Sequence, residues 1–208
     1  MLPVSPELMV RAYAAGIFPM ARSKDDPRLQ WVDPDPRGIL PLDEVHVPRS
    51  LRRTLRRGPF HVTADHAFDE VLEGCAEATE ERPDTWINDE LAALFRDLHE
   101  MGLAHSVEVW RDGALVGGLY GMALGGAFFG ESMFSRVTDA SKVALMHVVA
   151  RLRAGGFLLL DTQFVTQHLA RFGAIEIPRP SYHRLLNDAL EVTAEFPLTL
   201  KRPVVAYL

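Results

Sequence analysis

Three apolar segments that follow one another without a helix-forming segment between them constrain the fold most. They span residues 105–111, 114–124 and 126–134, and the two junctions carry Asp112-Gly113 and Gly125-Gly126. Dipeptides of this kind favour the tight turns of antiparallel hairpins. The sequence therefore predicts three consecutive antiparallel strands.

The elements around these strands alternate in type. A strand at 60–63 and two helices, beginning near Asp65 and Asn88, precede the hairpins, and Gly102 ends the second helix. A helix at 140–154, a strand at 158–161, a short helix at 166–172 and strands at 175–177 and 203–207 follow. The expected fold class is α/β (α+β), built on residues 60–208.

The first 59 residues predict a smaller α/β subdomain. Ser5-Pro6-Glu7 is typical of a helix start, and Gly16 marks the end of that helix. Two Asp-Pro pairs within residues 33–36 forbid a helix there. Short strands are expected at 39–40 and 45–47, before an arginine-rich helix that ends near Gly58.

Composition excludes several classes of protein. With 208 residues, 48% of them hydrophobic and 24% charged, the chain has the make-up of a soluble globular protein. A single cysteine, Cys75, cannot form a disulfide framework and lies on an apolar helical stripe, and the histidines lack the spacing of a zinc site. The amino terminus has no signal-peptide pattern, and no apolar run is long enough to cross a membrane, so we expect a cytoplasmic protein without a metal.

An arginine cluster stands out against the net charge of -6. Arg52, Arg53, Arg56 and Arg57 share one face of the expected helix, and we call these four residues the arginine stripe. Like charges at this spacing repel one another, so a polyanionic partner accounts for them better than a solvated helix face does.

The segment 126–136 contains two residues that are unusual in a strand. Gly130 removes a side chain, and Glu131 places a carboxylate among Phe128, Phe129 and Met133. Glycine within a strand often marks a bulge or the close approach of another molecule. An acid walled by apolar side chains would suit an amino-bearing ligand, although an exposed edge glutamate is the alternative.

A second group of polar residues ends the strand at 158–161. The apolar run stops at Asp161, and Gln163 follows two residues later. A buried parallel strand has this pattern, and ligands bind beyond the carboxyl ends of such strands. The two polar groups are therefore candidates for a shared site.

The element order of residues 60–208 resembles that of the acetyl-CoA-dependent N-acetyltransferase (GNAT) superfamily, whose members move an acyl group onto an amine. Those enzymes bind pyrophosphate with a glycine-rich turn after the third hairpin strand. Here the corresponding segment, 135–142, contains no glycine. We therefore expect a GNAT-like fold whose acyl donor is not coenzyme A.

The whole chain resembles the leucyl/phenylalanyl-tRNA–protein transferase family. The motifs that carry the resemblance are Gly16-Ile-Phe-Pro19, Trp31 with Asp33-Pro-Asp-Pro-Arg37, Thr85-Trp-Ile87, His105-Ser-Val-Glu-Val-Trp110, Gly117-Gly-Leu-Tyr-Gly121, Gly130-Glu-Ser-Met-Phe-Ser-Arg136, Ala140-Ser-Lys142 and Asp161-Thr-Gln163. Family members commonly have two tryptophans before the Asp-Pro-Arg stretch, whereas this chain has Trp31-Val32. From the residues alone, Trp31 is expected in the core, with a pocket wall as the alternative.

The resemblance implies an enzyme that transfers Leu or Phe, and as a further candidate Met, from aminoacyl-tRNA to the α-amino group of an N-terminal Arg or Lys, which marks the acceptor protein for degradation. It implies no cofactor, because the aminoacyl ester is already activated, and a monomer is expected. The implied catalytic residues are Asp161 and Gln163, the implied substrate-binding residues are Trp31, Trp86, Phe128, Gly130, Glu131, Ser132 and Met133, and the arginine stripe would bind tRNA.

Two other functions compete with this one. A small-molecule N-acyltransferase with an unusual donor is one alternative, and an RNA-binding regulator that has lost the chemistry is the other. The missing pyrophosphate turn argues against the first, and the polar pair at Asp161 and Gln163 argues against the second. Which of Glu131 and Asp161 contacts a basic acceptor side chain is left open by the sequence.

Overall fold

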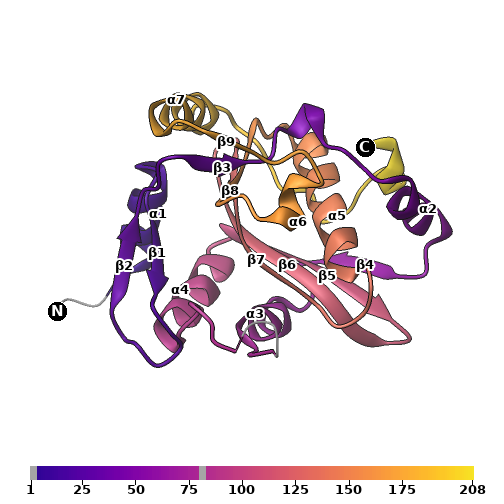
Figure 1. Cartoon of the computed structure of the whole chain (residues 1–208), viewed down its shortest axis with the longest axis horizontal. Coiled ribbons are helices and arrows are strands. Elements are labelled where there is room, and N and C mark those ends of the chain that lie inside the picture. The colour runs from indigo at the N-terminus through magenta and orange to yellow at the C-terminus, as the bar shows by residue number, and fades with distance from the viewer. Residues whose placement is uncertain (1–3, 80–82) are drawn as a thin grey trace.

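The computed structural model describes residues 4–79 and 83–208 and shows a mixed seven-stranded sheet with helices on both faces (Figure 1). The strands are β1 (Phe18–Ala21), β2 (Leu29–Val32), β3 (Arg37–Ile39), β4 (His61–Ala64), β5 (Ala104–Arg111), β6 (Ala114–Leu124), β7 (Ala127–Ser135), β8 (Leu159–Gln163) and β9 (Ile175–Ile177). The helices are α1 (Pro6–Ala14), α2 (Arg49–Arg57), α3 (Phe68–Ala76), α4 (Asp89–Glu100), α5 (Ala140–Gly155), α6 (Gln167–Ala170) and α7 (Arg179–Leu190), with short 3-10 helices η1 (Leu42–Glu44) and η2 (Val204–Ala206).

The three predicted hairpin strands form the middle of the sheet, whose order is β4-β5-β6-β7-β8-β3-β9. Both expected turns are present, and Asp112, Gly113 and Gly125 all have positive φ. The β6–β7 register pairs Gly121 with Gly130 but Tyr120 with Ser132, so Glu131 has no residue opposite it. This extra residue is the bulge that Gly130 predicted.

The strand after α5 is parallel to β7, as expected, but the two strands stay together only briefly. Pairing runs from Ala127 opposite Leu159 to Phe129 opposite Asp161 and stops there, although β7 continues to Ser135. The bulge at Glu131 follows directly. β7 and β8 therefore diverge just where both strands carry polar side chains.

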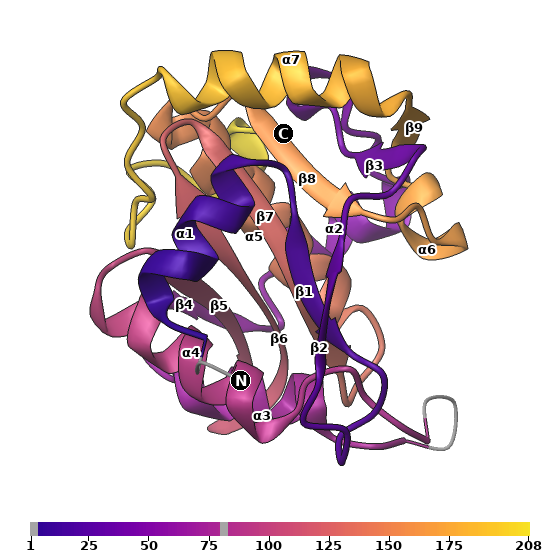
Figure 2. The same cartoon turned by 90° about the vertical axis from the view of Figure 1, so that its left-hand side faces the viewer.

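The N-terminal segment contributes to the same sheet. β3 lies between β8 and β9 and is antiparallel to both, although it falls within the predicted subdomain 1–59. β1 and β2 form a separate two-stranded sheet, which lies beside α1 in front of the larger sheet (Figure 2). The division of the chain at residue 59 stays a prediction.

Two predicted strands, at residues 45–47 and 203–207, are absent, and one helix, α7, was not predicted. Residues 45–47 form no strand, since they follow η1 in a segment between two prolines, Pro41 and Pro48. Within the expected strand 203–207, Val204–Ala206 form the 3-10 helix η2 instead, which packs against α2 and α5. The helix α7 was not predicted, because the segment opens with Pro178 at the N-cap and has no side-chain cap. It covers the end of the sheet formed by β8, β3 and β9 (Figure 2).

Two apolar cores lie on opposite faces of the sheet. The first contains buried residues of α1, α3, α4 and α7, and the second contains those of α2, α5 and α6. Cys75 is buried in the first core, as expected. Within the described residues, no helix is both long and apolar enough to span a membrane.

Candidate active site

A cavity of about 470 Å³ lies where β7 and β8 diverge. Its walls come from the end of β7, the end of β8, α5, α6 and the segment around Trp86. Most of the lining side chains are apolar, and they are Met20, Trp86, Leu119, Met133, Leu145, Val148, Leu160, Phe164 and Leu169. A mainly apolar cavity with a few polar groups is the usual form of a small-ligand site.

Glu131, the extra residue of the bulge, lines this cavity. Tyr13 donates a hydrogen bond to Glu131 Oε1 at 2.8 Å, and the Gln163 side-chain amide donates to Oε2 at 3.1 Å. Burial raises the pKa of Glu131 to about 8, although these two donors act to lower it. In the free protein the group is therefore predominantly protonated near neutral pH, and a bound cation would favour its ionised form.

The two predicted catalytic residues, Asp161 and Gln163, lie beside Glu131 at the end of β8. Gln163 has a left-handed backbone with φ 62°, which is uncommon for a residue with a side chain. Its backbone N–H donates to Asp161 Oδ1 at 2.8 Å, so the Asp161 side chain closes a turn at the end of the strand. The structure thus brings together Glu131, Gln163 and Asp161.

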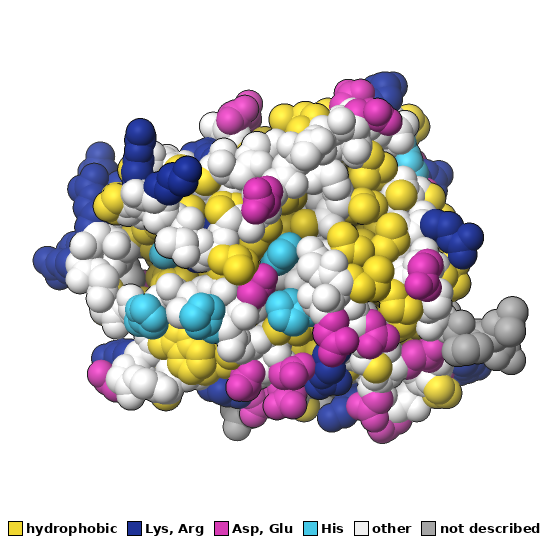
Figure 3. Space-filling view, turned by 180° about the vertical axis from the view of Figure 1, so that it is seen from behind, with side chains coloured by type: hydrophobic (Ala, Val, Ile, Leu, Met, Phe, Trp, Pro, Cys, Tyr) yellow, Lys and Arg dark blue, Asp and Glu magenta, His cyan; other side chains and the backbone are white. Residues whose placement is uncertain are grey.

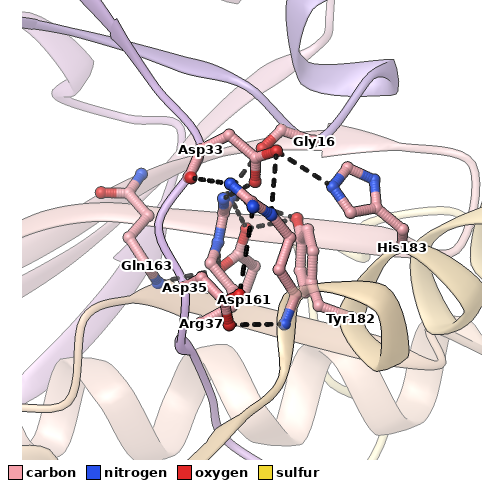
Figure 4. Close-up of polar contacts among 9 residues, drawn as sticks. Gly16, Asp33, Asp35, Arg37, Asp161, Gln163, Tyr182 and His183 are labelled. Atoms are coloured by element: carbon pink, nitrogen blue, oxygen red, sulfur yellow. Dashed lines mark hydrogen bonds and ion pairs between the residues drawn. The ribbon is translucent and has the colours of Figure 1, made fainter.

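The Asp161 carboxylate also binds a fully buried arginine (Figure 4). Arg37 donates from Nε to Oδ1 at 3.0 Å and from Nη2 to Oδ2 at 2.6 Å, and Tyr182 donates to Oδ2 at 2.7 Å. Burial acts to lower the pKa of Arg37, but the hydrogen bonds and charge of Asp161 outweigh it and the pKa lies above its ordinary value. Asp161 is thereby enclosed, and it does not belong to the cavity lining.

Five of the seven predicted substrate-binding residues line the cavity, namely Trp86, Gly130, Glu131, Ser132 and Met133. Phe128 does not. At Phe128 the neighbouring strand β8 is still paired, opposite Leu160, and the ring stacks on Phe196 at 5.5 Å in the core. Its predicted place in the pocket wall is wrong.

Trp31 is also absent from the cavity wall. It lies on β2, which pairs with β1 in the two-stranded sheet, and its side chain is 40% exposed. The interpretation of Trp31 as a core residue is therefore wrong as well. The tryptophan that faces the cavity is Trp86.

The arginine stripe lies on α2, away from the cavity. Arg53, Arg56 and Arg57 are exposed and Arg52 is partly exposed. Seen from behind, basic side chains project from the side of the molecule where α2 lies (Figure 3). α2 packs against α5, and Leu145 and Val148 of α5 line the cavity. The helix α5 therefore connects the arginine stripe with the cavity.

Several residues near the cavity were given no role from the sequence. Tyr13 and Tyr182 come from helices remote from each other in the chain, α1 and α7, and no local pattern marks them as site residues. Arg37 ends the Asp-Pro-Asp-Pro-Arg motif, and that motif was the available signal. Thr162 and His168 also line the cavity, and their buried atoms Oγ1 and Nε2 have no hydrogen-bond partner among the described residues.

The described residues contain no group of three or more His, Cys, Asp or Glu side chains that could hold a metal ion. The site supplies a hydrogen-bonding side chain, Gln163, and a buried carboxyl group, Glu131, at a mainly apolar cavity.

Comparisons with known proteins identify related sequences over almost the whole chain. The family model described as leucyl/phenylalanyl-tRNA protein transferase matches residues 39–187, and the model described as its N-terminal domain matches residues 3–35. A leucyl/phenylalanyl-tRNA–protein transferase of Paramagnetospirillum magneticum is 65% identical over 94% of this chain and 94% of its own. One from Rhodospirillum rubrum is 61% identical over 94% of this chain and 92% of its own.

Solved structures give a more remote likeness. An L-PGS from Bacillus licheniformis has a TM-score of 0.40 and 13% sequence identity, with 79% of this chain and 55% of that chain covered. A likeness at this level supports no conclusion about fold or activity.

Proposed function

Because the chain belongs to the leucyl/phenylalanyl-tRNA–protein transferase family, it is an enzyme that transfers Leu or Phe from aminoacyl-tRNA to a protein amino terminus, and we propose that the acceptor begins with Arg or Lys. The observation that carries this acceptor preference is the buried Glu131 carboxyl group in an otherwise mainly apolar cavity. An ionised carboxylate there would be uncompensated without a cationic group beside it. An acceptor that begins with Asp or Glu would bring no cation to stabilise the ionised form of Glu131, and its own carboxylate would be buried without a partner.

The apolar part of the cavity takes the donor side chain. Met133 and Trp86 are among the apolar residues that line it, and Gly130 leaves space that a larger residue would fill. A Cβ at Gly130 would lie 3.5 Å from the backbone oxygen of Asp161, which is an ordinary contact. Backbone packing therefore does not require glycine at position 130. We assign the space beside Gly130 to the ligand instead.

The reaction needs no cofactor in this proposal. The nitrogen of the acceptor α-amine attacks the carbonyl carbon of the aminoacyl ester, the new amide bond forms, and the ester C–O bond breaks. The amine loses one proton, and the 3′ oxygen of the released tRNA gains one. Since the ester is already activated, the enzyme contributes mainly by holding amine and carbonyl together.

Gln163 is the residue that we assign to the amine. Its Nε2 donates to Glu131, which leaves the carbonyl oxygen Oε1 to accept an N–H of the incoming amine. That hydrogen bond aims the nitrogen lone pair at the ester carbon. Glu131 on β7 would thus bind the basic side chain of the acceptor, and Gln163 on β8 would bind its α-amine.

The arginine stripe is assigned to the tRNA backbone. Its exposed guanidinium groups lie together on α2 in an otherwise acidic chain, and phosphate contacts of this kind supply affinity without sequence recognition. The acceptor stem would then lie along α2 and α5 and deliver its 3′ end to the cavity.

Three further features belong to the proposal. The divergence of β7 and β8 supports a GNAT-like arrangement in which donor and acceptor meet between two splayed strands. Residues 1–59 would form a small unit docked on the larger one, with β3 inserted into the sheet of residues 60–208. The enzyme would act as a cytoplasmic monomer.

The test is transfer of radiolabelled Leu from Leu-tRNA to peptides that begin with Arg, Lys, Asp or Ala and are otherwise identical. We expect label on the Arg and Lys peptides alone. Equal labelling of the Ala peptide would refute the assigned preference, and labelling of the Asp peptide would refute the role of Glu131.

A further inference from the structure

We infer that Arg37 and Tyr182 are positioning residues for the transfer reaction, and that they act through Asp161 to hold Gln163 in its working conformation. This inference rests on the proposed function of Gln163. In it, Asp161 is neither a base nor a contact for the acceptor.

The hydrogen bonds of Asp161 leave it no capacity for a substrate. Oδ1 accepts from Arg37 Nε and from the Gln163 backbone N–H, and Oδ2 accepts from Arg37 Nη2 and from the Tyr182 hydroxyl. A carboxylate has about four lone-pair sites, and these donors fill them. The side chain is also 0% exposed. Contact with a basic acceptor side chain therefore falls to Glu131.

The guanidinium group of Arg37, which binds the Asp161 carboxylate, is itself fixed by several contacts. Its third donor, Nη1, bonds to the Gly16 carbonyl at 2.8 Å, and the guanidinium lies over the rings of Phe18 and Tyr182 at 4.7 and 4.2 Å. Asp33 adds a second carboxylate at 4.0 Å from Nη1 (Figure 4). A planar fork with fixed partners places Asp161 in one orientation.

Asp161 in turn fixes the backbone of Gln163. A residue with a side chain adopts φ 62° only where its surroundings impose this strained conformation. The hydrogen bond from the Gln163 N–H to Asp161 Oδ1 is the contact that offsets the strain. The resulting turn aims the Gln163 side chain back across the gap to Glu131 on β7.

The placement of β3 supports the same inference. Gly38, next to Arg37, pairs with Gln163, and a Cβ at Gly38 would meet the backbone carbon of Phe164 at 2.7 Å. Only glycine allows β3 to approach this turn so closely. The strand that delivers Arg37 to Asp161 is therefore also the strand on which the Gln163 turn packs.

The test compares Tyr182→Phe, Arg37→Lys and Asp161→Asn, each alone and the first two each combined with Asp161→Asn. Single-turnover transfer from bound Leu-tRNA is measured across a titration of an Arg peptide. Tyr182→Phe removes one hydroxyl and keeps the ring over Arg37, so the fold should survive even where Arg37→Lys is unstable. Arg153→Met is the matched control, because Arg153 binds the carbonyls of Leu42 and Tyr207 outside the site.

Because a misplacement of about 1 Å can cost on the order of 100-fold in rate, we expect each single variant to lower the rate at saturating peptide by about 10- to 100-fold. Aminoacyl-tRNA affinity and the peptide concentration for half-maximal rate should stay close to wild type. Each double variant should be no slower than Asp161→Asn alone, since all three residues act through one carboxylate. Arg153→Met should lower the melting temperature and leave the rate unchanged.

The inference is overturned if the Tyr182→Phe rate equals wild type, if only the half-maximal peptide concentration changes, or if the effects in the double variants multiply. Failure of the proposed function gives a different result, because the wild-type enzyme would then not label the Arg peptide at all.

Discussion

Replacement of Glu131 by glutamine should change how the stability of the protein depends on pH. Burial raises the pKa of Glu131 in the folded state to about 8 from an ordinary value of 4.5. Between these two values the folded state holds a proton on this group that the unfolded state has released. The unfolded state binds fewer protons there, so the free energy of unfolding must fall as pH rises. Below pH 4.5 both states are protonated and this contribution is fully retained.

The size of this loss of stability follows from the difference between the folded and unfolded pKa values of Glu131. Each pKa unit corresponds to about 1.4 kcal/mol, so the rise from 4.5 to about 8 removes on the order of 5 kcal/mol of stability by pH 8. A glutamine side chain cannot ionise, and the Glu131→Gln variant therefore lacks this pH-dependent loss. It should gain stability relative to wild type with each pH unit between about 5 and 8 and gain nothing further above about pH 8.

Urea unfolding of both proteins at unit steps from about pH 5 to about pH 9 measures this difference. The slope of the difference against pH is the informative quantity, since altered hydrogen bonds with Tyr13 and Gln163 shift the curve by a constant. Glu176→Gln, which replaces an exposed glutamate on β9, is the matched control and should follow wild type. Parallel curves for Glu131→Gln and wild type would show that Glu131 titrates normally and would refute the reasoning.

Four other outcomes are expected. Glu131→Gln should raise the KM for an Arg peptide by roughly 10- to 100-fold with a smaller effect on kcat, as for a charged hydrogen bond worth about 1.5 to 3 kcal/mol; an unchanged KM would exclude the contact. Glutamine at all four positions of the arginine stripe should weaken tRNA binding and flatten its log–log salt slope by about 0.7 to 0.9 per lost phosphate contact, whereas four exposed arginines elsewhere, Arg11, Arg28, Arg184 and Arg202, should tolerate the same change. Gly130→Leu should fill the cavity and abolish Leu transfer at a melting temperature near that of wild type, and normal transfer would refute the pocket assignment. Phe128→Ala should cost about 3 to 5 kcal/mol of stability as a core substitution, whereas Met133→Ala should lower Leu transfer more than stability, and chemical denaturation with transfer assays separates the two.

The sequence alone determined the elements whose signals are local. The caps at Ser5 and Asn88 are present, with their side chains accepting from the backbone N–H groups of Leu8 and Leu91. Alternating apolar strands and glycine turns specified the hairpins, and Gly130 beside Glu131 specified the bulge. These features depend on neighbours a few residues apart, and periodicity records such neighbours directly. The signal for α7 was also local, because Tyr182, Leu186 and Ala189 are spaced as one helical face, but no polar cap marked its start.

The tertiary structure alone decided which polar groups meet. Arg37 and Asp161 are 124 residues apart, and Tyr13 and Glu131 are 118 apart, so no periodicity connects either pair. The insertion of β3 between β8 and β9 brings the first pair together, and the divergence of β7 from β8 opens the cavity at Glu131 but not at Phe128. Strand pairing between distant segments is set by which faces can be buried together, and that depends on the whole chain. The types of residue at this site could therefore be read from the sequence, whereas their partners and the enclosure of Asp161 followed only from the packed fold.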